Sequence, residues 1–232
     1  MLQKNLEMIY ENIEQSAIKS GRRMEDITLI AVTKTVEPSV IRDVLSAGVF
    51  KLGENKVQEL LTKHSLFSQQ AEVPVPEWHM IGHLQTNKVK SVIDKVQMIQ
   101  SVDSVRLADE INLRAQQKNI VMDVLIEINI AKEDKKYGFD VEETEKIVEY
   151  MFDLSNIRLC GLMCIAPFVV NPIKNKKYFN KMYEKFIDIK KKYPYNSDIR
   201  YLSMGMSNDY IPAIEEGANM VRIGSSLFGA RS

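Results

Sequence analysis

The stretch Val121-Met-Asp-Val-Leu-Ile-Glu-Ile-Asn-Ile130 decides the fold, because it is an apolar run rich in β-branched residues. A run of this kind is typical of a strand buried within a parallel sheet. The segments on either side of it, 104–117 and 141–152, are predicted to be helices. Strand 121–130 therefore belongs to an alternating series of strands and helices.

The same alternation extends along the chain in both directions. The predicted strands are 27–33, 49–53, 78–82, 97–102, 121–130, 157–163, 199–203 and 219–224. The other predicted helices are an N-terminal one to about residue 18, then 38–48, 55–67, 86–94, 174–192, a short one through 214–217, and a short one after 226. Eight units without a long linker favour an α/β fold, a single (β/α)8 TIM barrel with an extra N-terminal helix. We expect residues 1–232 to form one domain. An open doubly wound sheet is the alternative.

Composition excludes several classes of protein. Lysine and arginine together number 31, as do aspartate and glutamate, so nothing attracts nucleic acid or an anionic membrane. The N-terminus is amphipathic and carries acidic residues, unlike a signal peptide, and no apolar run approaches the ~20 residues of a membrane span. Cys160 and Cys164, the only cysteines, are interpreted as buried thiols in a reducing compartment. We expect a cytoplasmic protein.

Lys34 lies at a position where (β/α)8 barrels place active-site residues. Active sites of such barrels lie at the C-terminal ends of the strands, and Lys34 directly follows strand 27–33. A lysine whose stem starts inside the barrel is costly unless it is paired or neutral. Desolvation lowers the pKa of a lysine and makes it a nucleophile for carbonyls. The alternative is a lysine that reaches the rim or pairs with a carboxylate.

Two turns of small residues follow the last two strands. They are Ser203-Met-Gly-Met-Ser207 and Gly224-Ser-Ser226, each ahead of a predicted helix. Barrels often bind phosphate with the loops after strands seven and eight, where helix N-terminal N–H groups favour an anion. The sequence therefore predicts a phosphate site. The alternative is two ordinary helix caps.

Arg222 and His79 are the remaining polar candidates. If Val221 and Ile223 pack against the helices, strand alternation points Arg222 into the barrel, where it needs a partner. That partner is either a flat ligand acceptor or a structural carboxylate. His79 and His83 straddle a strand end without a metal-binding motif, so no metal site is predicted, and His79 is interpreted as a core or ligand-stacking residue.

The sequence resembles a known family across nearly its whole length. It is similar to the pyridoxal phosphate (PLP) homeostasis proteins, PLP-binding proteins of the alanine racemase N-terminal-domain type. The matching segments are Ala31-Val-Thr-Lys-Thr35, Gly53-Glu-Asn-Lys-Val-Gln58, Trp78-His-Met-Ile-Gly-His-Leu-Gln-Thr-Asn-Lys88, Gly161-Leu-Met-Cys-Ile-Ala-Pro167, Leu202-Ser-Met-Gly-Met-Ser-Asn-Asp209 and Val221-Arg-Ile-Gly-Ser-Ser226.

The resemblance implies a role for each site residue. It implies that Lys34 carries pyridoxal 5'-phosphate as a Schiff base and that Arg222 faces the pyridine nitrogen. The residues implied to bind the phosphate are Ser207, Gly224 and Ser225, and those implied to lie beside the cofactor are Asn55 and His79. Cys164 and the loop 131–138 depart from the commonest family forms. Three lysines of that loop are expected to influence how PLP leaves: Lys132, Lys135 and Lys136.

The resemblance also implies a carrier rather than an enzyme. Alanine racemases resemble this barrel and also use an arginine opposite the pyridine nitrogen, but they add a second β-domain and a tyrosine from the partner subunit. This sequence ends at Ser232, after the eighth unit, so we expect neither. We expect storage or delivery of PLP by a monomer, with apo-PLP enzymes as recipients and no catalytic residue.

Three other functions stay open. A slow amino-acid racemase would use His79 or a loop lysine as second base. A Schiff-base aldolase would use Lys34 with a sugar phosphate. A pure interaction module would leave the lysine and the phosphate turns unexplained.

Overall fold

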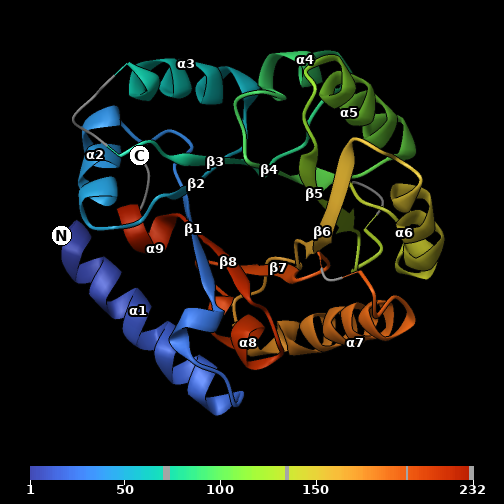
Figure 1. The fold of residues 1–232 in the computed structure, drawn as a ribbon. Helices are drawn as coiled ribbons and strands as arrows, with labels where there is room; N and C mark the ends of the chain where they lie inside the picture. The colour runs from blue at the N-terminus through green and yellow to red at the C-terminus, as the bar shows by residue number, and fades with distance from the viewer. Residues whose placement is uncertain (70–73, 134–135, 197, 230–232) are drawn as a thin grey trace.

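Eight parallel strands close into a barrel in the computed structural model, which describes residues 1–69, 74–133, 136–196 and 198–229. The strands pair in chain order, and β8 pairs with β1 (Figure 1). They are β1 (Thr28–Val32), β2 (Lys51–Glu54), β3 (Glu77–Met80), β4 (Met98–Val102), β5 (Met122–Ile128), β6 (Ile157–Cys164), β7 (Tyr201–Met206) and β8 (Met220–Ile223). The predicted barrel is therefore confirmed, and the open sheet is wrong.

Helices surround the barrel (Figure 1). They are α1 (Leu2–Lys19), α2 (Pro38–Ser46), α3 (Val57–Ser68), α4 (Val89–Val92), α5 (Val105–Gln117), α6 (Thr144–Phe152), α7 (Lys176–Lys192), α8 (Tyr210–Glu215) and α9 (Ser225–Phe228). The predicted extra helix, α1, packs against α8 and α9. Pro38 begins α2, where its missing N–H costs nothing. Ser104 caps α5 by accepting a hydrogen bond of 3.3 Å from the N–H of Leu107.

Strand alternation divides the core in two. Leu29 and Ala31 of β1 belong to the large cluster between strands and helices, whereas Ile30 belongs to a second cluster inside the barrel. The other members of this inner cluster are Met98, Leu125, Cys160, Met163 and Met220. Both cysteines are buried and free, as predicted.

Three local predictions differ from the structure. The strand predicted at 199–203 is β7, which continues to Met206 because the pairing with β8 shifts register after Ser203 and Gly205 takes a φ of +90°. The helix predicted at 86–94 is only a 3-10 turn, Thr86–Lys88, followed by the four-residue α4. The helix predicted at 55–67 is α3, which begins at Val57, so Asn55 lies outside it. Asn55 instead points into the cavity described below.

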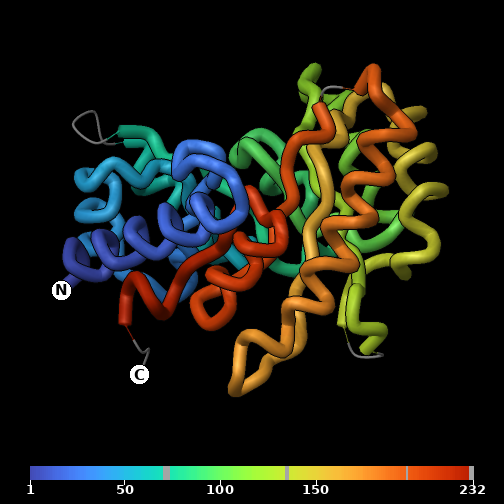
Figure 2. The backbone as a smooth tube through the Cα atoms, turned by 90° about the horizontal axis from the view of Figure 1, so that it is seen from below, coloured from blue at the N-terminus to red at the C-terminus, as the bar shows by residue number. Residues whose placement is uncertain are grey.

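The loops after β5 and β6 project from the same side of the barrel, as Figure 2 shows. They follow the C-terminal ends of their strands, so this side is the one on which barrels bind ligands. No helix in the described ranges is long and apolar enough to cross a membrane.

Candidate functional site

Six of the seven predicted site residues line one cavity of about 370 Å³ at the C-terminal ends of the strands. This volume lies within the range of about 300–1,000 Å³ found for small-ligand pockets. The predicted residues that line it are Lys34, Asn55, Ser207, Arg222, Gly224 and Ser225, and the others are Val32, Ile81, Ile165, Phe168, Met206 and Asn208. The structure thus brings together residues at or just after the C-terminal ends of β1, β2, β7 and β8. We call this space the main cavity.

The Lys34 side chain enters the main cavity without a partner. It is half-buried, and within the described ranges its ammonium group has neither a hydrogen bond nor an ion pair. The lysine is therefore not held by a carboxylate, which was one of the two structural alternatives. An amine in this position is available to a ligand.

The backbone around Lys34 is held by a network of buried groups. The ammonium group of Lys63 donates hydrogen bonds of 2.6 Å to the carbonyl oxygen of Thr33 and 2.7 Å to Oε1 of Glu54. The Thr33 hydroxyl donates to the same oxygen at 2.6 Å. Thr35 has a φ of +57°, and its N–H donates to Oε2 of Glu59 at 2.7 Å. These contacts from β2 and α3 fix the strand end that carries Lys34.

A close backbone approach places Asn55. A Cβ on Gly82 would lie only 2.5 Å from the carbonyl oxygen of Asn55, so only glycine fits there. The absence of a side chain lets the end of β3 lie against the loop after β2. Asn55 then lines the main cavity beside Ile81.

The two small-residue turns meet at the hydroxyl group of Ser207. Its oxygen accepts hydrogen bonds from the backbone N–H groups of Gly224 at 3.0 Å and Ser226 at 3.2 Å. The Ser226 hydroxyl donates to the carbonyl oxygen of Ser207 at 3.1 Å. Two backbone donors at the start of α9 thus converge with a hydroxyl at the cavity wall, an arrangement that suits an anion. Ser226 is a participant beyond the predicted set, although it stands in the same turn.

Arg222 points into the barrel, as the alternation of β8 predicted. Arg222 is only 3% exposed, while Val221 and Ile223 pack in the large cluster between strands and helices, which we call the outer cluster. Its guanidinium donates from Nη1 to the hydroxyl oxygen of Ser203 at 2.6 Å and from Nη2 to the carbonyl oxygen of Cys164 at 2.8 Å. Burial lowers the pKa of this guanidinium. Its described partners are neutral, so its charge remains available to a ligand in the main cavity.

His79 lies inside the barrel but does not line the main cavity. Its Nδ1 accepts a hydrogen bond of 3.0 Å from the side-chain amide of Gln100, whose oxygen accepts one of 2.7 Å from Ser203. Complete burial lowers the pKa of His79 to about 3, so the ring is neutral at physiological pH. His79 thus reaches Arg222 only through two intervening side chains. Its place beside a cofactor stays a prediction.

Gln100 and Glu127 are inward-facing polar residues that the sequence analysis missed. Each interrupts an apolar strand two residues after a member of the inner cluster, Gln100 after Met98 and Glu127 after Leu125. Residues two apart in a strand share a face, so both point into the barrel. A polar residue in that position needs a partner or a function, so the signal was present. Burial raises the pKa of Glu127 to about 7, with a smaller contribution from the nearby charge of Asp103.

Cys164 and the loop 131–138, which depart from the commonest family forms, make contacts within the protein. The Cys164 side chain packs in the outer cluster, and burial raises the pKa of its thiol to about 12. In the loop 131–138, Lys132 pairs with Glu142 at 2.9 Å and Lys136 with Glu133 at 2.6 Å. Lys135 lies outside the described residues.

The two histidines near the third strand do not share a ligand site. His83 bonds to Oδ2 of Asp103 at 2.6 Å and stacks on the ring of Tyr137 at 3.7 Å. Among the described residues, no group of three or more histidine, cysteine, aspartate and glutamate side chains could hold a metal ion.

Comparison with known proteins gives a consistent result. The family model described as alanine racemase, N-terminal domain, matches residues 5–232. A pyridoxal phosphate homeostasis protein of Aquifex aeolicus is 42% identical over 228 residues, which are 98% of this chain and 97% of the relative. One from Escherichia coli strain K12 is 37% identical over 227 residues, covering 98% and 95%.

Solved structures show the same likeness. The structure of PipY from Synechococcus elongatus with PLP bound has a TM-score of 0.78 at 30% identity, covering 88% of this chain and 93% of PipY. PipY without PLP has a TM-score of 0.85 at 27% identity, covering 99% and 100%. An alanine racemase of Clostridium difficile shares the fold, with a TM-score of 0.69 at 20% identity, covering 99% of this chain and 56% of the racemase.

Proposed function

This chain belongs to the alanine racemase N-terminal domain family, and on that premise we propose that it binds PLP and serves in PLP homeostasis. One observation supports the proposal most directly. The unpaired amine of Lys34 lines the same cavity as Ser207, Gly224 and Ser225 of the two small-residue turns. An aldehyde that carries a phosphate needs both groups. The names of the relatives and the PLP in the PipY structure agree with this reading.

Six of the seven predicted residues have a place in this proposal. Lys34 holds the cofactor as a Schiff base, and Arg222 faces the pyridine nitrogen from inside the barrel. The residues that bind the phosphate are Ser207, Gly224 and Ser225, and Asn55 lies beside the ring. When bound, PLP supplies an aldehyde that reacts with primary amines.

We further propose that the protein stores and delivers PLP without conventional catalysis. Neither the Cys164 thiol nor the His79 ring makes a good acid or base: the thiol, with a pKa of about 12, stays protonated, and the ring, with a pKa of about 3, stays neutral. A permanently charged arginine disfavours protonation of the ring nitrogen and so weakens the cofactor as an electron sink. The free buried thiols suit the cytoplasm. Apo-PLP enzymes are the proposed recipients, and a monomer the proposed state.

Absorption and mass spectrometry test the binding proposal. The purified protein should be yellow, and borohydride should leave a pyridoxyl phosphate group on Lys34. Lys34→Ala should abolish the adduct. Lys56→Ala should keep it, because it removes an exposed lysine at the same end of the barrel, after β2. A colourless protein that takes up no PLP would sink the proposal. Trapping of Lys34 only with a sugar phosphate would support an aldolase.

Transfer tests the carrier role. Mixing the loaded protein with an apo-PLP enzyme should restore that enzyme's activity. Equal rates with and without a dialysis membrane between the two proteins would show delivery by free diffusion, and a faster rate in direct contact would show handover between proteins. No restoration in either arrangement would contradict delivery.

A further inference from the structure

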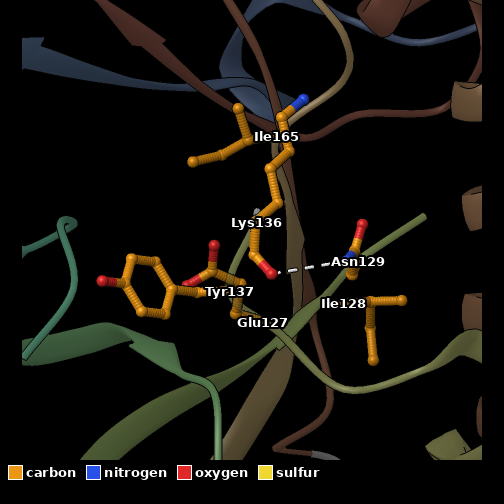
Figure 3. Close-up of a pocket in the computed structure, with 6 residues that line it drawn as sticks. All are labelled: Glu127, Ile128, Asn129, Lys136, Tyr137 and Ile165. Carbon is orange, nitrogen blue, oxygen red and sulfur yellow. Dashed lines mark hydrogen bonds between the residues drawn. The ribbon is translucent and has the colours of Figure 1, made fainter. Parts of the chain in front are cut away.

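A second, smaller cavity adjoins the main one. It has a volume of about 130 Å³ and is lined by Glu127, Ile128, Asn129, Lys136, Tyr137 and Ile165 (Figure 3). Ile165 lines both cavities, so the two spaces are neighbours at the C-terminal ends of the strands. We call the smaller space the side chamber.

Glu127 is the polar group of the side chamber that has no partner. Its residue is only 6% exposed, and within the described ranges its carboxyl group has neither a hydrogen bond nor an ion pair. The Lys136 and Asn129 side chains are already occupied. The Lys136 ammonium bonds to Glu133 at 2.6 Å and to the carbonyl oxygen of Ala166 at 3.4 Å. The Asn129 amide donates to the Glu133 carbonyl at 2.9 Å and accepts from the Glu133 N–H at 3.2 Å.

A buried carboxyl group without a partner calls for a donor or a cation. An anion in the chamber would be repelled by Glu127 and by Asp103 nearby, and the charge of Lys136 is already paired with Glu133. A metal ion would need several oxygen ligands, and among the lining residues that the structure describes only Glu127 carries a carboxyl group. An organic cation needs one counter-ion and an apolar wall, which Glu127 and Ile165 supply.

We propose that the side chamber binds a small organic ammonium ion, with the Glu127 carboxylate as its counter-ion. The volume of about 130 Å³ is close to that of an engineered cavity of about 150 Å³ that holds benzene, so an ammonium with a few carbon atoms fits. The binding rests on the chamber alone. The functional role of this binding, which is to hold an amine beside the aldehyde of PLP, rests on the function proposed above.

The affinity should depend on pH through Glu127. The carboxyl group has a pKa of about 7, and only its ionised form attracts a cation. The charged groups that act on it are Asp103 at the end of β4 and Arg222 of β8, while Lys136 and Tyr137 face it from the loop after β5. Binding should therefore strengthen as the pH rises through about 7.

Calorimetry with trimethylammonium chloride tests the proposal on the PLP-loaded protein. This tertiary ammonium keeps one N–H donor but cannot form a Schiff base, so its binding does not report on Lys34. Glu127→Gln keeps the shape of the side chain and removes its charge. Glu142→Gln is the matched control, because it removes the charge of an exposed carboxylate in the segment after the same loop.

The expected result is saturable binding to the unchanged protein and to Glu142→Gln, with at least tenfold weaker binding to Glu127→Gln. Absence of saturable binding, or equal affinity for both variants, would overturn the proposal. Preference for acetate or for potassium would overturn it as well. Repeating the titration on protein stripped of PLP separates the two proposals, since the chamber should bind the cation even if the chain proves not to carry the cofactor.

Discussion

The guanidinium group of Arg222 donates a hydrogen bond of 2.6 Å to the hydroxyl oxygen of Ser203, which in turn donates one of 2.7 Å to Gln100. Gln100 donates to His79 at 3.0 Å. The four side chains come from β8, β7, β4 and β3 and form one hydrogen-bonded chain across the barrel. This chain accounts for the buried polar groups around Arg222, and it orients the guanidinium toward the main cavity.

Ser203→Ala should destabilise the protein by about 1–3 kcal/mol, because Gln100 and Arg222 would each lose a buried partner. Urea denaturation measures this loss as a lower midpoint. Ser65→Ala, at an exposed position of α3, is the control and should change stability by less than about 0.5 kcal/mol. Equal effects of the two substitutions would show that the hydrogen-bonded chain contributes nothing.

Lys63→Met should cost roughly 3–5 kcal/mol, because it leaves the buried carboxylate of Glu54 without its cation. PLP retention should fall as well, since the strand end that carries Lys34 loses a contact at Thr33. Adding Glu54→Gln should recover part of the stability. In contrast, Lys51→Met breaks a partly exposed pair with Glu77 and should cost less than about 1 kcal/mol. A similar cost for both lysines would refute the argument.

The neutral His79 should make the protein sensitive to acid. Its folded pKa of about 3 lies below the unfolded value near 6.5, so the stabilisation is complete above pH 6.5 and is lost as the pH falls toward 3. His79→Gln cannot titrate, so its free energy of unfolding should fall less between pH 6.5 and 4.5 than that of the unchanged protein. Parallel pH curves for the two proteins would contradict this expectation.

Glu127 should lower the stability of the protein as the pH rises, the opposite of the effect of His79. Its folded pKa of about 7 exceeds the unfolded value near 4.5, so its contribution to stability is complete below pH 4.5 and is lost as the pH rises through 7. At pH 8, Glu127→Gln should be more stable than the unchanged protein by on the order of 3 kcal/mol, and this gain should vanish at pH 4.5. Glu142→Gln should not show the gain. Chemical denaturation at the two pH values measures both differences.

Ser207→Ala should weaken PLP retention by about ten- to one-hundredfold, because a phosphate would lose one hydroxyl partner worth about 1–3 kcal/mol. Combining it with Ser225→Ala should add to the loss. Dialysis followed by absorption measurement gives the retained fraction. Ser46→Ala, at an exposed position of α2, serves as the control. Unchanged retention in the double variant would remove both serines from the site.

The site could be predicted in part. Lys34, Ser207 and Arg222 lie in one cavity, as expected, because each follows from its distance to the end of a strand. Asn55 lies at the cavity as well, as its place after a strand end predicts, and its close approach to Gly82 of another unit could not be predicted. The roles of these residues toward PLP, and the single domain of residues 1–232, stay predictions.

By itself, the sequence determined the alternation of strands and helices, the barrel, and the side of it that carries the polar residues. These features follow from periodicity and turn chemistry within short segments. Only the tertiary structure decided that Arg222, Ser203, Gln100 and His79 are joined, and that Glu127 faces a chamber without a partner. The physical reason is that such contacts connect strands far apart in the chain, whose register and inward neighbours depend on closure of the whole barrel.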